Sequence, residues 1–212
     1  MKNRFQEVEG FFQEPDKIRE TAMGPTFEYW PAESHPDGGN WPGIRSVFIS
    51  AKDQNIFDQV VASFYKTQGW ELSRSVYFES YFQSFQKKDG TSWVHTDIMH
   101  QNWTHVCIVY LTPGAPPSGG TVFYEPKDGS TLDELKAKHG GEIPGDEENY
   151  NVIHDSANQY NKAVVYLPHE LHKSNVYFGD TFKNSRLIQI SFIRDNEAQP
   201  ADGRRGQVGT LT

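Results

Sequence analysis

A histidine and an aspartate two residues apart, His95 and Asp97, lie in SWVHTDIMHQNW, residues 92–103, directly after a strand-like stretch. Imidazole and carboxylate groups are both common ligands of transition-metal ions. With 8 histidines and 28 acidic residues among 212, about one such triplet is expected by chance, so its surroundings must supply the evidence. A second triplet, His35 to Asp37, is crowded by proline and glycine, which favours a solvated turn or loop.

A metal site that uses His95 and Asp97 needs a third ligand from elsewhere in the chain. Two histidines and one carboxylate leave three positions open on an octahedral ion, an arrangement typical of non-haem iron(II) oxygenases. The stretch YLPHELHKSNVYFG offers His169, in a connection, and His172, at the start of a strand-like run. His100 and His105 are local alternatives. An ordinary hydrogen-bonded histidine is the competing interpretation for each, and the residues alone leave the choice open.

Length and composition predict one domain that is soluble and intracellular. The 212 residues suffice for one substantial core. The one cysteine, Cys107, excludes an intramolecular disulfide and lies in an apolar run, which favours an inert buried thiol in a reducing cytoplasm. The N-terminal MKNRFQEVEG lacks the apolar core of a signal peptide, and no apolar stretch is long enough to span a membrane.

Charge and aromatic content restrict the class of partner. The formal net charge is −8, and lysine and arginine are scattered apart from GRR near the C-terminus, which counts against nucleic acid as the main partner. Aromatic residues make up 14% of the chain and include five tryptophans. This content suits a β-rich core or a ligand cavity.

Three segments have helical patterns and seven have strand patterns. Residues 14–23 and 53–68 show helical periodicity, and 130–141 is a shorter candidate with Ser130 as N-cap and Gly140 as its stop. Short runs rich in β-branched and aromatic residues predict a sandwich or jelly roll rather than a parallel sheet. These runs are 44–50, 75–86, 104–112, 120–125, 162–167, 172–178 and 186–194.

The order of the elements predicts one domain with three parts. Helical support covers about residues 1–70, the jelly-roll core about 75–195, and a C-terminal tail 196–212. The long connection between Glu125 and Lys162 interrupts the regular spacing of the strands. We expect this connection to be an insertion or a lid.

The ordered motifs HTD, THVCIVYLTPG, SGGTVFYEP, KAVVYLPHELHKSNVYFG and NSRLIQISF resemble those of iron(II)- and 2-oxoglutarate-dependent dioxygenases. The resemblance is to the prolyl-4-hydroxylase-like branch and its small bacterial and phage relatives, and it spans about residues 76–194. Each motif is weak, but the ordered set is specific. Beyond the triplet, the matching places are filled by Thr104, Tyr110-Leu111, Gly119-Gly120 with Phe123, His172 and Arg186.

This resemblance implies a mainly β fold, a double-stranded β-helix of the jelly-roll type, with N-terminal helices at its side. It implies Fe(II) bound by His95, Asp97 and His172, and no catalytic residue beyond the metal centre. Arg186 would pair with the distal carboxylate of the cosubstrate 2-oxoglutarate, and Tyr110 would add a hydroxyl. The implied reaction uses O₂ to hydroxylate a C–H bond, releases succinate and CO₂, and draws on ascorbate as a possible reductant.

Two positions depart from the family pattern. Phe85 lies ten residues before the first histidine, at a place where many members carry tyrosine. The hydroxyl that this tyrosine offers to the proximal part of the cosubstrate is therefore missing unless Tyr81 supplies it. Ile190 stands where a polar residue is frequent. Halogenating relatives replace the carboxylate ligand by a small residue, so the presence of Asp97 favours hydroxylation.

The substrate has no direct signature in the sequence. The resemblance favours a small molecule or peptide, with a peptidyl or free amino acid, proline first, as the expected group. Trp93, Trp103 and the connection 126–161 are the expected walls of its cavity. The acidic balance counts against a nucleobase substrate, and no membrane partner is expected. The alternative from another class is a non-catalytic jelly-roll module that binds a metal or a sugar.

Overall fold

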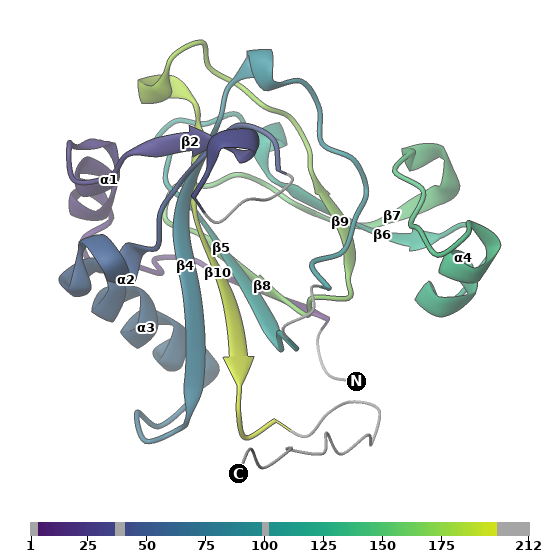
Figure 1. Ribbon diagram of the computed structural model, residues 1–212, viewed down its shortest axis with the longest axis horizontal. Helices are drawn as coiled ribbons and strands as arrows, with labels where there is room; N and C mark the ends of the chain where they lie inside the picture. The colour runs from purple at the N-terminus through teal and green to yellow at the C-terminus, as the bar shows by residue number, and fades with distance from the viewer. Residues whose placement is uncertain (1–3, 37–40, 99–101, 199–212) are drawn as a thin grey trace.

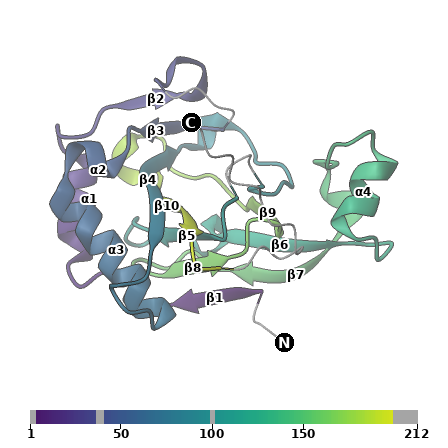
Figure 2. The same ribbon diagram turned by 60° about the horizontal axis from the view of Figure 1, so that its bottom comes forward.

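The computed structural model describes residues 4–36, 41–98 and 102–198, which form two antiparallel sheets that face each other (Figures 1 and 2). In this part of the chain the larger sheet has the order β1-β8-β5-β10-β4-β3-β2, and the smaller has the order β7-β6-β9. The strands are β1 (Phe5–Val8), β2 (Tyr29–Pro31), β3 (Ile44–Ser46), β4 (Val76–Phe85), β5 (His105–Tyr110), β6 (Thr121–Pro126), β7 (Tyr150–Ser156), β8 (Ala163–Tyr166), β9 (Leu171–Ser174) and β10 (Arg186–Asp195).

The strands from β4 onward wind between the two sheets. The larger sheet takes β4, β5, β8 and β10, and the smaller takes β6, β7 and β9. The segment that contains His95 joins the edge of the smaller sheet through a bridge to His172. This winding is the double-stranded β-helix, or jelly roll, that the resemblance implied, so the predicted fold class is confirmed.

Alternating side chains give the larger sheet two different faces. On β4, Phe78 and Phe82 belong to an outer core cluster, whereas Tyr81 and Phe85 point between the sheets. Helices α1 (Pro15–Met23) and α3 (Gln54–Gln68) cover the outer face, with the short α2 (Ile49–Lys52) between them in the chain (Figure 1). The helices predicted at 14–23 and 53–68 are confirmed. The inner face remains available for a site.

The predicted elements differ from the observed ones at edges and ends. Only residues 44–46 of the predicted strand 44–50 are extended, because the chain turns into α2, and β9 ends at Ser174 rather than at residue 178. Strands β1, β2 and β7 were not predicted; β1 and β2 are three or four residues long, too short for a periodic signal. Helix α4 (Leu132–Lys138) is capped by Thr131, not Ser130, because Thr131 and Glu134 form a capping box.

The connection 126–161, which we expected to be an insertion or a lid, forms an ordered arm. It contains α4 and β7, and β7 pairs along β6 (Figure 1). Leu135 and Tyr150 pack with Val122, Tyr124 and Leu171 in a small separate core cluster. The arm is therefore held in place by its own buried side chains.

His35 and Cys107 are both buried side chains. His35 is buried and its Nε2 lies 3.0 Å from the carbonyl oxygen of Ser46, so its prediction as part of a solvated loop is wrong, while Asp37 lies outside the described residues. Cys107 is buried, and burial raises the pKa of its thiol, in agreement with an inert side chain. Within the described ranges, the helices are too short or too polar to cross a membrane.

Candidate metal centre

The backbone places His95 directly opposite His172. The amide of each residue donates to the carbonyl oxygen of the other, at 3.0 and 2.9 Å, and the two imidazole ring centroids are 4.4 Å apart. Two residues further on, the amide of Asp97 donates to the carbonyl oxygen of Pro168 at 2.8 Å. Side chains two residues apart on an extended segment point to the same face, so His95 and Asp97 both face His172.

The side chains of His95, Asp97 and His172 form a compact group of candidate metal ligands. One ligand atom from each residue lies within 4.8 Å of the others, and His172 is buried while the other two are half-buried. The structure thus brings together the three residues that the resemblance implied. His169 is outside the group, because its side chain is 56% exposed and lies 3.7 Å from Glu170.

The local histidine alternatives do not join this group. His105 lies on the outer face of the larger sheet, where its ring packs against Phe64 and Trp70. His100 lies outside the described residues. Among the histidines that the structure describes, His172 is therefore the partner of the triplet.

Hydrogen bonds to the backbone orient both imidazole rings. Nδ1 of His95 lies 2.9 Å from the carbonyl oxygen of Trp93, and Nδ1 of His172 lies 2.9 Å from that of Glu170. A carbonyl oxygen can only accept, so each Nδ1 carries the proton and each Nε2 is available to a metal ion. Such bonds to the second ring nitrogen are characteristic of metal-binding histidines.

Tyr166, on β8, orients the carboxylate. Its hydroxyl donates to Oδ2 of Asp97 at 2.7 Å and lies 3.1 Å from Nε2 of His172. The sequence does not single out Tyr166, because one tyrosine in an apolar strand such as KAVVYL has the pattern of a core residue.

The charges of the three groups suit a cation. Burial alone would raise the pKa of Asp97, but His172 and His95, with hydrogen bonds from His172 and Tyr166, lower it to about 2. Burial and the neighbouring His172 lower the pKa of His95, which favours a neutral imidazole. Burial opposes protonation of His172, but Asp97 outweighs it and raises the pKa of His172. A metal ion bound by Nε2 of His172 and by Asp97 would take the place of the additional proton that the raised pKa favours on His172.

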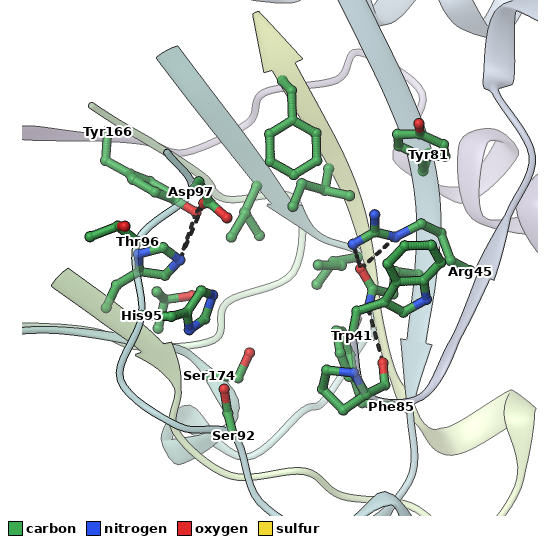
Figure 3. A pocket seen from close by; sticks show the side chains of 18 of the residues that line it. Trp41, Arg45, Tyr81, Phe85, Ser92, His95, Thr96, Asp97, Tyr166 and Ser174 are labelled. Carbon is green, nitrogen blue, oxygen red and sulfur yellow. Dashed lines mark hydrogen bonds and ion pairs between the residues drawn. The ribbon is translucent and has the colours of Figure 1, made fainter. Parts of the chain in front are cut away.

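A cavity of about 480 Å³ lies between the sheets, with the three candidate ligands in its wall (Figure 3). Its middle is apolar and is lined by Phe48, Ile108, Ile188, Ile190 and Phe192. Trp93 lines the cavity as expected. Trp103 and the described residues of the connection 126–161 do not, so the prediction that they form its walls is wrong.

Arg186 is fully buried beside this cavity and has no anionic partner in the part of the chain that the structure describes. Its Nε donates to the carbonyl oxygen of Gly119 at 2.7 Å, and its Nη2 to that of Gly120 at 3.3 Å. Among the described residues, its Nη1 has no hydrogen-bond partner and no carboxylate lies within ion-pair distance. The arginine side chain lies over the ring of Phe85, 5.0 Å from the ring centroid. A buried cation of this kind is costly unless an anion pairs with it.

Tyr110 and Thr121 connect Arg186 to the cavity. The hydroxyl of Tyr110 donates to Oγ1 of Thr121 at 2.9 Å, and Thr121 lines the cavity. The backbone at Gly120 passes close to that of Ser156. Only glycine fits there, because a Cβ at position 120 would lie 1.8 Å from the carbonyl oxygen of Ser156. The Gly-Gly pair of the sequence motif thus lets the chain pass close to β7 and Arg186.

The two departures from the family pattern lie on the same cavity. Phe85, Tyr81 and Ile190 all line it. Tyr177 stacks on Phe85 with ring centroids 4.8 Å apart, and its buried hydroxyl has no hydrogen-bond partner among the described residues. Besides Tyr81, Tyr177 therefore provides a hydroxyl near Phe85. The sequence pattern did not indicate it.

Comparisons with known proteins place this geometry in a wider context. No model of a known protein family matches the sequence, and no curated protein matches it. Among solved structures, HygX from Streptomyces hygroscopicus with nickel and 2-oxoglutarate bound is 11% identical, with a TM-score of 0.61 and coverage of 95% of this chain and 90% of HygX. A prolyl hydroxylase from Trichoplax adhaerens, in complex with a peptide fragment of hypoxia inducible factor, is 9% identical, with a TM-score of 0.56 and coverage of 92% and 84%.

The third similar structure is SnoN, a non-haem α-ketoglutarate-dependent epimerase from nogalamycin biosynthesis. It is 11% identical, with a TM-score of 0.54 and coverage of 95% of this chain and 87% of SnoN. The fold of this chain is that of the jelly-roll 2-oxoglutarate/Fe(II) oxygenases. The resemblance found in the sequence is therefore confirmed for the fold.

Proposed function

We propose that this protein is an Fe(II)- and 2-oxoglutarate-dependent oxygenase that hydroxylates a C–H bond of its substrate. The observation that carries the proposal is the group of His95, Asp97 and His172 in the wall of a cavity inside a jelly roll. Two imidazoles and one carboxylate are the ligands of non-haem iron(II) oxygenases. HygX, which shares the fold, binds nickel and 2-oxoglutarate.

The three side chains fit a resident metal ion. The backbone carbonyls of Trp93 and Glu170 hold the Nδ1 protons, so both Nε2 atoms keep a lone pair for the ion. Tyr166 holds one oxygen of Asp97 and leaves the other available. When bound, Fe(II) and 2-oxoglutarate supply the oxidising chemistry, in which O₂ converts the cosubstrate to succinate and CO₂.

Arg186 and Tyr110 fit the cosubstrate. The unpartnered Nη1 of Arg186 is a buried donor that a carboxylate can satisfy, and a guanidinium suits such pairing. Thr121 and Tyr177 line the cavity, with Oγ1 of Thr121 3.5 Å from Nη2 of Arg186, and they would offer hydroxyls to the same ligand. The apolar middle of the cavity would exclude water from the reacting atoms.

The proposed substrate is a small molecule or a peptide side chain, with a peptidyl or free amino acid, proline first, as the leading group. Among proteins of this fold, the Trichoplax enzyme was solved with a peptide and HygX with hygromycin B. The net charge of −8 counts against nucleic acid. We further propose a cytoplasmic location, in keeping with a single buried thiol.

Turnover of the cosubstrate tests the proposed function. With Fe(II) and O₂, the purified protein should slowly convert 2-oxoglutarate to succinate without any added substrate, because metal and cosubstrate suffice for uncoupled decarboxylation. Asp97→Ala should reduce succinate to background, since it removes a ligand. Equal succinate from both proteins would reject the oxygenase and favour the non-catalytic module that binds a metal or a sugar.

A further inference from the structure

A second arginine, Arg45, lines the cavity on the side opposite His95 and Asp97 (Figure 3). It lies on β3, where its Cα pairs with that of Gln83 on β4. Cross-strand partners share a face of the sheet, so both side chains project between the two sheets. Figure 3 shows the guanidinium group of Arg45 extending into the cavity.

The side chain of Arg45 is held rigidly. Its guanidinium carbon lies 4.0 Å from the ring centroid of Trp41 and 5.1 Å from that of Tyr81. Nε and Nη2 both donate to Oε1 of Gln83, at 3.1 and 2.7 Å, and Nε2 of Gln83 donates to the carbonyl oxygen of Pro42 at 3.0 Å. These contacts fix the fork before any ligand arrives, which lowers the entropic cost of binding.

The positive charge of Arg45 has no paired carboxylate in the described part of the chain. No acidic oxygen there lies within ion-pair distance of it, and Gln83 is neutral. Nη1 of Arg45 makes no hydrogen bond to any of the described residues. Burial lowers the pKa of Arg45 to about 10, which still leaves it charged at neutral pH.

The carboxylates that line the cavity do not compensate this charge. Asp97 acts on Arg45 only from the opposite wall, and a cation held by Asp97 would cancel that effect. Glu79 also lines the cavity, but its carboxylate lies outside ion-pair distance of Arg45, and one of its oxygens accepts from the hydroxyl of Tyr77. A half-buried, stacked guanidinium that has no carboxylate partner among the described residues is a site suited to an anion.

We propose that Arg45 binds a carboxylate of the substrate, which makes the substrate class a small organic acid such as an amino acid with a free carboxylate. The inference rests on the proposed function, in which the metal centre and Arg186 take the two carboxylates of 2-oxoglutarate. Arg45 then remains for the substrate. A ligand anchored there extends along the apolar middle of the cavity and presents a C–H bond to the metal centre.

The test compares free L-amino acids with their C-terminal amides, because each pair differs in charge at the group that Arg45 would bind. Each probe is titrated calorimetrically into protein loaded anaerobically with Fe(II) and 2-oxoglutarate. At least one amino acid should bind about 10-fold or more tightly than its amide, as expected for a hydrogen bond to a charged group. A panel without binding, or an amide that binds as tightly, would overturn the inference.

Substitutions then assign the effect to Arg45. Arg45→Gln should weaken binding of the amino acid about 10- to 150-fold and leave binding of its amide unchanged. Arg45→Lys keeps the charge but loses the stacked fork, so it should be intermediate, and it decides the matter if Arg45→Gln does not fold. Arg194→Gln is the matched control, because Arg194 also lies over an aromatic ring, that of Tyr77 at 5.0 Å, but does not line the cavity.

Cosubstrate binding separates this inference from the proposed function. The visible charge-transfer band of bound Fe(II) and 2-oxoglutarate should form in the parent and in both Arg45 variants with unchanged 2-oxoglutarate affinity. No band in the parent would reject the proposed function itself. A normal band with unchanged amino-acid binding in the Arg45 variants would overturn only the inference. Weaker binding of 2-oxoglutarate to Arg45→Gln would also overturn the inference and would assign Arg45 to the cosubstrate.

Discussion

At the scale of single residues, the candidate site depends on how side chains are held as much as on which side chains are present. His95, Asp97 and His172 could be proposed from the sequence because their order matches a family pattern. Tyr166, Tyr177 and Arg45 could not, because contacts between distant strands leave no spacing signal in the chain. Figure 3 shows His95 and Asp97 on one side of the cavity and Arg45 on the other, although these residues are distant in the sequence.

Tyr166 provides a residue-scale prediction. Tyr166→Phe removes the hydrogen bond to Oδ2 of Asp97 and should weaken Fe(II) binding about 10- to 100-fold, the usual cost of losing a partner of a metal ligand. Anaerobic metal titration measures the effect. Tyr160→Phe is the control, because its hydroxyl bonds only to Asp16 among the described residues. Unchanged affinity in Tyr166→Phe would show that the tyrosine does not position the carboxylate.

At the scale of elements, regular strands were predictable and the short edge strands were not. The patterns of β4, β5 and β10 are long enough to reveal alternation, and their predicted bounds agree with the observed ones to within two residues. β1 and β2 contain three or four residues, and their pairing depends on the neighbouring strand rather than on their own sequence. β9 ends after Ser174, although the amides of Asn175 and Val176 still donate to the carbonyl oxygens of Gly120 and Ser118.

The position of β9 separates the two neighbouring histidines. His172 lies within β9, paired with Phe123 and opposite His95, whereas His169 lies in the turn before it. His172→Ala should therefore abolish iron retention, and His169→Ala should leave most of it. Iron content of the two purified variants measures this difference. Equal loss, or greater loss in His169→Ala, would contradict the assignment of the third ligand.

At the scale of the whole molecule, the two faces of the larger sheet have different roles. The outer face of the larger sheet packs against the helices, and its inner face lies toward the smaller sheet (Figure 2). Residues of both sheets line the cavity between them. The jelly roll could be predicted from the number and spacing of strands together with the ordered motifs. The helix of the arm at 126–161 was predicted as the candidate 130–141, but β7 and the packing of the arm against β6 were not, because these contacts join segments that are distant in the sequence.

The central claim is that one cavity holds a metal ion at His95, Asp97 and His172 and a 2-oxo acid against Arg186. The most direct test is anaerobic titration of 2-oxoglutarate into the Fe(II)-loaded protein, followed by the visible charge-transfer band. Tyr110→Phe removes one neutral donor and should cost about 0.5–1.5 kcal/mol of 2-oxoglutarate binding, with the metal retained.

Arg186→Ala is the decisive variant in this titration. It leaves a carboxylate buried without its partner, at a cost on the order of 2–5 kcal/mol, so 2-oxoglutarate should bind about 30-fold to several thousandfold more weakly. Iron binding should hardly change, because no ligand is removed. The account predicts a band in the parent that Arg186→Ala shifts to much higher 2-oxoglutarate concentration. No band in the parent, or a band at the same concentration in both proteins, would contradict it.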